Sequence, residues 1–145
     1  MGLDSSFYDA SPASSQIPSM AAGPSIRTDE MRWHQHRIRN FKGSTVLLSH
    51  HQLFSICEKI NGNKTKFKKF SCFNPLMYAQ LFEHLGDVSA WFWGHEHSFM
   101  LFKDNLFGVS KSRLVGNSSF HVINEIDTPY DRPKDFPFIP FITED

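Results

Sequence analysis

The chain has 145 residues, 40% of them hydrophobic, and a formal net charge of +0 at pH 7. This length suits one domain with a sizeable core, and the neutral charge gives no general argument for binding to nucleic acid or to a membrane surface. No apolar run reaches the roughly 18 residues that a transmembrane helix needs, and the amino terminus lacks the basic and apolar regions of a signal peptide. The two cysteines, Cys57 and Cys72, have no zinc-type spacing, so reduced thiols in a cytoplasmic protein are expected.

Residues 1–27 are rich in Ser, Ala, Pro and Gly and have no periodicity that could bury a face, so we expect a flexible or irregular segment. Thr28 or Asp29 can then cap a helix. The two histidines at i and i+2 on this helix, His34 and His36, diverge, so they are expected to pack or to lie at the surface. The helix runs to about Phe41, with one apolar stripe of Met31, His34, Ile38 and Phe41.

Two short apolar runs, 45–48 and 88–93, are rich in β-branched or aromatic residues and predict strands. Between them lies a lysine-rich stretch, 58–69, which we interpret as a solvated loop rather than a nucleic-acid site. Asn74 can cap and Pro75 can start a helix through Leu85, and Gly86 is placed to end it. His84, like the histidines of the first helix, is expected to have a packing or surface role.

The remaining chain predicts a hairpin, a last strand and a tail. Strands at 99–102 and 106–109 flank Lys103-Asp104-Asn105, which is typical of a hairpin turn. Residues 120–126 predict one more strand. From 127 to 145, prolines alternate with aromatic residues, so we expect an extended tail that lies over the domain or reaches a neighbour.

Histidine clusters follow both apolar runs directly. His50 and His51 come after the first run, and His95 and His97 come after the second. On an extended backbone the i and i+2 histidines point to the same side, and Gly94 would let the chain leave its strand sharply. Ligands collect beyond the carboxyl ends of strands in open α/β sheets, and neutral imidazole binds zinc, iron, nickel and copper. The sequence therefore predicts a metal site.

The two blocks, TVLLSHHQ at 45–52 and WFWGHEH at 91–97, resemble the last two signature blocks of the calcineurin-like metallophosphoesterases. The resemblance covers roughly residues 29–125. It implies an α/β sandwich of mixed β-sheets flanked by helices, which hydrolyses a phosphate ester with divalent ions (Mn, Zn or Fe). It also implies that His50 and His95 bind one metal, that His97 binds the other, and that His51 lines the substrate side as a catalytic residue.

The family's first three blocks, Asp-x-His, Gly-Asp-x-x-Asp and Gly-Asn-His, do not occur in this sequence. Two ions about 3.5 to 4 Å apart need a bridging carboxylate, whereas three neutral histidines suit one ion in an open site. We therefore expect residues 28–126 to be the carboxyl-terminal half of an incomplete domain. Residues 1–5 resemble a strand ending of related phosphoesterases, so we expect the start of the chain to lie inside a larger domain.

Three functions stay open at this point. The first is half of a phosphoesterase, inactive alone, whose missing amino-terminal half lies upstream or in a protein partner. The second is a small metal-binding protein with a three-histidine site. The third is a non-catalytic protein-interaction module derived from the same fold.

Overall fold

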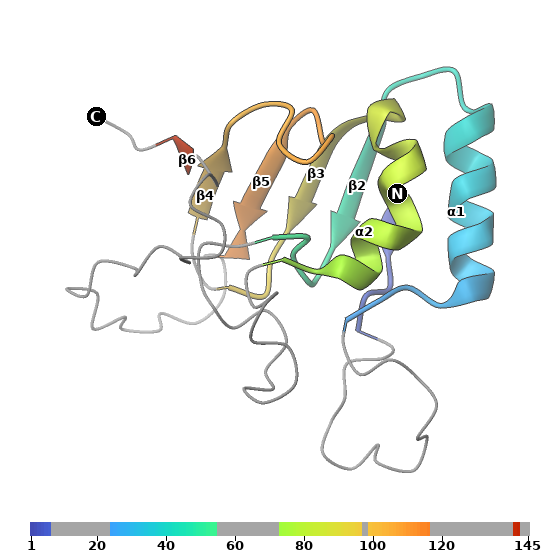
Figure 1. The fold of residues 1–145 in the computed structure, drawn as a ribbon, viewed down its shortest axis with the longest axis horizontal. Coiled ribbons are helices and arrows are strands. Elements are labelled where there is room, and N and C mark those ends of the chain that lie inside the picture. The colour runs from blue at the N-terminus through green and yellow to red at the C-terminus, as the bar shows by residue number, and fades with distance from the viewer. Residues whose placement is uncertain (7–23, 55–72, 97–98, 117–140, 143–145) are drawn as a thin grey trace, which may run out of the picture.

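The computed structural model describes residues 1–6, 24–54, 73–96, 99–116 and 141–142. In these ranges the chain has an α/β fold, as predicted, with a mixed six-stranded sheet in the order β1-β2-β3-β5-β4-β6 (Figure 1). The first four strands of that order are parallel, β4 is antiparallel to β5, and β6 is antiparallel to β4. The strands are β1 (Gly2–Leu3), β2 (Thr45–Ser49), β3 (Val88–Trp93), β4 (Phe99–Phe102), β5 (Ser112–Val115) and β6 (Phe141–Ile142).

Helix α1 (Thr28–Asn40) connects β1 to β2. Its predicted stripe is confirmed at Met31, His34 and Ile38, which are buried, but Phe41 is 61% exposed. The helix ends one residue before Phe41, whose extended backbone turns the ring away from the stripe. In the first turn, the backbone N–H of Glu30 and then the Arg27 guanidinium lower the pKa of the Asp29 carboxyl.

Helix α2 (Pro75–Leu81) and the 3-10 helix η3 (Phe82–Asp87) connect β2 to β3. The predicted cap is confirmed, because the Asn74 side chain accepts a hydrogen bond from the Met77 N–H at 3.1 Å. The role expected of Gly86 is wrong: the chain tightens into η3, and Gly86 lies inside it. This tighter turn buries Leu85 in the core. No helix in the described ranges is long and apolar enough to cross a membrane.

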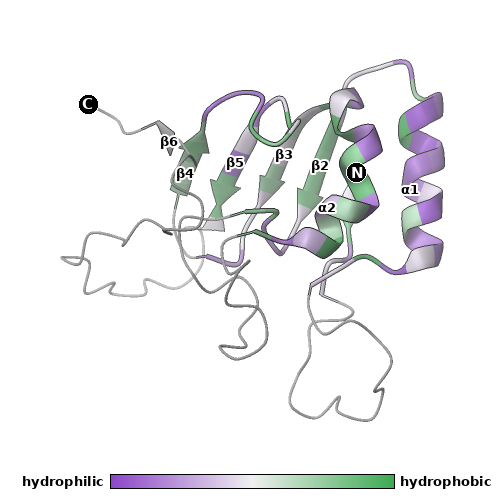
Figure 2. Ribbon diagram, in the orientation of Figure 1, coloured by the Kyte–Doolittle hydropathy of each residue, from purple (hydrophilic) through white to green (hydrophobic). Residues whose placement is uncertain are grey.

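One face of the sheet forms the core. Leu47, Trp91, Trp93 and Leu114 project from this face and are almost completely buried. They share one hydrophobic cluster with Ile38 of α1 and with Met77, Leu81 and Leu85 of the second connection. The strands are mainly hydrophobic in Figure 2, whereas α1 is mainly hydrophilic with an apolar stripe. Both connections therefore cover the same face.

The opposite face, which we call the open face, is apolar and exposed. The strand register places Val46, Leu48, Phe99 and Val115 on this face. Leu48 is 52% exposed and Phe99 is 50% exposed. Parallel strands are normally buried on both faces, and none of the described helices or strands forms a layer on the open face.

Two segments differ from their predictions. Gly2–Leu3 forms β1, which agrees with the strand ending that residues 1–5 resemble but contradicts the expectation that all of residues 1–27 are irregular. It pairs with the edge of β2, and two residues carry no periodic pattern of their own. The hairpin is wrong in its second arm: β4 pairs with β5, while Leu106 and Val109 form an isolated bridge. Left-handed backbone at Asn105, Phe107 and Gly108 turns the chain there, so that the strand pairing with β4 begins only at Ser112.

Residues 120–126, predicted as a strand, lie outside the described residues, as do the lysine-rich stretch and most of the tail. Within the expected tail, β6 adds to the edge of the sheet beside β4. This pairing agrees with a tail that lies over the domain.

Candidate metal centre

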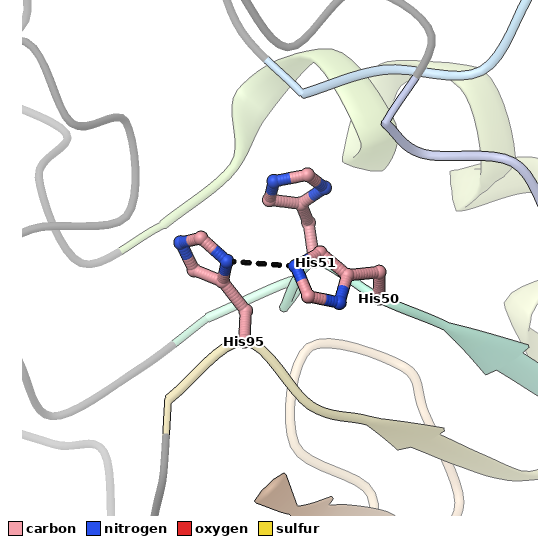
Figure 3. A group of neighbouring side chains, drawn as sticks. All are labelled: His50, His51 and His95. Atoms are coloured by element: carbon pink, nitrogen blue, oxygen red, sulfur yellow. Dashed lines mark hydrogen bonds between the residues drawn. The ribbon is translucent and has the colours of Figure 1, made fainter. Parts of the chain in front are cut away.

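The ends of β2 and β3 bring the two predicted histidine clusters together. The strands are parallel neighbours, and Ser49 lies opposite Trp93 at their last residues. The Gly94 N–H then donates to the His50 carbonyl at 3.1 Å, which extends the pairing by one residue. As a result, Nδ1 of His95 lies 3.0 Å from Nε2 of His50 (Figure 3). The prediction that these histidines meet at one sheet edge is confirmed.

The backbone at His95 is left-handed, with a φ of 67°, and not extended as predicted. The Glu96 N–H donates to the Gly94 carbonyl at 2.8 Å, so His95 is the centre of a three-residue turn. A Cβ on Gly94 would lie 3.8 Å from the His50 carbonyl oxygen, which is an ordinary contact, so this position does not require glycine. The chain turns sharply out of the strand at His95, not at Gly94 as predicted. Left-handed backbone costs a non-glycine residue about 1–2 kcal/mol, and such strain concentrates at functional sites.

Three imidazoles form the cluster, since one ligand atom each from His50, His51 and His95 lies within 4.8 Å of the others. Two nitrogens on a tetrahedral ion, each at about 2.0–2.1 Å, are about 3.3 Å apart, so the 3.0 Å contact between His50 and His95 is close to a chelating geometry. The ring of His51 is tilted beside that of His95, with 4.6 Å between centroids. The donor set and its spacing therefore fit a metal ion.

The cluster is open on one side. His50 and His95 are exposed, whereas His51 is buried. The cluster is therefore accessible from outside through His50 and His95.

Of the two remaining predicted site residues, one joins the cluster and the other is not described. His51, predicted to be catalytic on the substrate side, belongs to the cluster itself as its third imidazole. His97, predicted to bind a second metal, lies outside the described residues, and its role stays a prediction.

The other described histidines pack in the core or lie at the surface, as predicted. Nε2 of buried His34 lies 3.0 Å from a carboxylate oxygen of Glu30, and Nε2 of buried His84 lies 3.4 Å from the Arg39 guanidinium. His36 is exposed on α1. None of these three belongs to the cluster.

The sequence reasoning missed several residues that hold the cluster. Gln52 is buried and donates through Nε2 to the Glu96 carboxylate at 3.1 Å, which links the two histidine loops. Ser49 accepts from the Trp91 indole N–H at 2.9 Å and donates to the His51 carbonyl at 2.7 Å. Nothing in the sequence around Gln52 indicates which residue its side chain contacts.

Gly116 is a further missed residue. It follows β5 and lies against the turn at His95. A Cβ at this position would stand 1.7 Å from the Glu96 carbonyl oxygen. The close approach of two backbones therefore requires glycine here, and it supports the turn that carries His95.

No protein-family model matches this chain, and no curated protein sequence matches it. The function is therefore inferred from the residues and their geometry.

Proposed function

We propose that this chain is the carboxyl-terminal half of a metal-dependent phosphoesterase, in which His50 and His95 hold a divalent ion. The observation that carries the proposal is the convergence of three imidazole ligand atoms within 4.8 Å of one another. They meet at the carboxyl ends of two adjacent parallel strands, where ligands collect in open α/β sheets. The blocks that converge are those that resemble the metallophosphoesterase blocks.

A bound ion would polarise a phosphoryl oxygen and would lower the pKa of water from about 15.7 to about 7. The exposed rings of His50 and His95 leave the outer side of the cluster accessible to a phosphate ester. Buried His51 closes the inner side. Imidazole donors suit zinc and iron, and manganese remains the third candidate when carboxylates join the site.

The half-site interpretation rests on charge. Neutral imidazoles cannot balance two cations, so a two-ion phosphoesterase needs carboxylates beyond this cluster. The open face supports the same interpretation, because a further layer packed on Leu48 and Phe99 would cover the apolar surface that the described residues leave exposed. Such a layer would adjoin β2, whose carboxyl end carries His50.

A non-catalytic interaction module is the second candidate. The same open face favours it, since large exposed apolar surfaces mark interaction sites. It assigns no role to the converging histidines, and for that reason we rank it second.

Metal binding by the full chain tests the first step. After loading with Zn²⁺ or Mn²⁺ and dialysis, elemental analysis should find one ion per wild-type chain. His95→Gly removes an imidazole while suiting the positive φ, so the fold should persist and the ion should be lost. His36→Ala, an exposed histidine outside the cluster, is the matched control and should keep the ion. Equal metal content in wild type and His95→Gly would overturn the proposal.

Activity tests the second step. The chain alone should not hydrolyse p-nitrophenyl phosphate, whereas the chain joined to a segment carrying Asp-x-His and Gly-Asp-x-x-Asp blocks should do so. This gained activity should disappear in His50→Ala. Stoichiometric metal without activity in any such combination would identify a small metal-binding protein instead.

A further inference from the structure

Ser5 lies buried beside the cluster, where the chain leaves β1. Its Oγ accepts a hydrogen bond from the His51 backbone N–H at 3.0 Å and lies 3.2 Å from Nδ1 of the same residue. Ser5 and His51 are each 1% exposed. Because Leu3 and Ser49 are opposite one another in the β1–β2 register, the residues two positions beyond each strand end meet.

We propose that Ser5 is the positioning residue of this metal centre: its hydroxyl fixes the His51 ring through Nδ1, so that His51 presents Nε2 to an ion held by His50 and His95. The proposal rests on the proposed function, which supplies the ion. A hydroxyl both donates and accepts, so it bonds Nδ1 in either neutral tautomer. Outer hydrogen bonds of this kind orient the imidazoles that bind metals.

Helix α1 holds Ser5 in place. The Asp4 N–H, one residue before Ser5, donates to Oε1 of Glu30 at 2.9 Å. The same oxygen lies 3.0 Å from Nε2 of buried His34, which fixes the carboxylate on α1. The Ser5 N–H donates to the Leu3 carbonyl at 3.0 Å and turns the chain toward His51. A continuous set of contacts therefore joins α1 to the cluster through the exit of β1.

Variants of Ser5 can distinguish a role in orienting the His51 ring from a general contribution to the stability of the fold. Ser5→Ala removes the hydroxyl and both of its contacts with His51. Ser5→Thr keeps the hydroxyl and should restore the orientation. Ser6→Ala is the matched control, because Ser6 is exposed and only its backbone N–H bonds to Asp4, at 3.2 Å.

The state of the His51 ring is observed through its ¹⁵N shifts in long-range ¹⁵N–¹H NMR spectra. These are recorded on the histidine-labelled full chain at one fixed pH, first without metal. Wild type, Ser5→Thr and Ser6→Ala should each show one set of ring ¹⁵N shifts for His51. Ser5→Ala should show altered, averaged shifts. With Zn²⁺, Ser5→Ala should bind about 10–100-fold more weakly than wild type, and Ser5→Thr should recover most of that loss.

The two proposals fail in different ways. Unchanged His51 shifts together with wild-type Zn²⁺ affinity in Ser5→Ala would overturn the role of Ser5 and leave the metal centre standing. If wild type itself binds no Zn²⁺, the proposed function fails, and so does the part of this inference that concerns metal binding. The metal-free spectra then decide whether Ser5 orients His51. A loss of affinity that Ser5→Thr does not recover, with His51 shifts unchanged, would also count against orientation.

Discussion

The two faces of the sheet are made by the same strands and both carry apolar residues, yet the described helices cover one face and not the other. On β2, Leu47 is 0% exposed and its neighbour Leu48 is 52% exposed. Successive residues of a strand point to opposite faces, so these two leucines differ only in the face they occupy. Both helical connections lie on the Leu47 face, and the described part of the chain places no helix on the other.

This difference shows that hydrophobicity along a strand does not by itself decide burial. The helix-covered face is buried in the core, whereas the open face is exposed at Leu48 and Phe99. The histidine cluster lies at the edge where these faces end, with His51 buried and His50 and His95 exposed. In the described part of the chain, an exposed apolar face and an accessible histidine cluster thus occur at adjoining places.

The largest expected effect comes from the leucine pair on β2. Leu47→Ala removes buried methyl groups and should lower the free energy of unfolding by about 2–5 kcal/mol. Leu48→Ala trims a half-exposed side chain and should cost about 0.5 kcal/mol. Urea unfolding of the two variants beside wild type gives both values. Equal losses would mean that the open face is buried in solution, and the contrast between the faces would be lost.

A smaller effect is expected where β5 meets the turn at His95. Gly116→Ala places a Cβ 1.7 Å from the Glu96 carbonyl oxygen, so the backbone must move, at a cost of about 1–3 kcal/mol. Gly86→Ala is the matched control, because its Cβ would meet nothing within 4 Å, and it should be neutral or slightly stabilising.

The same pair tests the support of the cluster. Metal binding should weaken in Gly116→Ala and stay unchanged in Gly86→Ala, as measured by titration with Zn²⁺. Wild-type affinity in Gly116→Ala would show that the turn at His95 does not depend on β5.

The smallest expected effect concerns the cap of α2, the helix that helps to cover the core face. Buried Asn74 accepts from the Met77 N–H and donates to the Pro24 carbonyl at 2.9 Å. Asn74→Ala removes both bonds and should cost about 1–2 kcal/mol. Asn40→Ala also removes a side-chain bond to the backbone, but Asn40 is exposed, so the cost should stay within about 0.5 kcal/mol. Thermal unfolding checks both, and an equal loss in the two variants would contradict the burial of Asn74.

Local patterns predicted α1, β2, β3 and the Asn74 cap, because each depends on neighbouring residues in the chain. The meeting of His50 and His95 was also predictable, since adjacent parallel strands end at one edge. The extended backbone at His95 and the helix end at Gly86 were wrong, because close packing chose a left-handed turn and a 3-10 turn instead.

The pattern of apolar residues and the placement of histidines after apolar runs were sufficient to specify an α/β sheet with imidazoles at its carboxyl edge. Three features depended on contacts between distant segments: β1 against β2, which brings Ser5 to His51; Gly116 against the turn at His95; and the choice of which sheet face the helices cover. A two-residue strand and a single glycine carry no periodic signal. Only the packing of the folded chain gives them their roles.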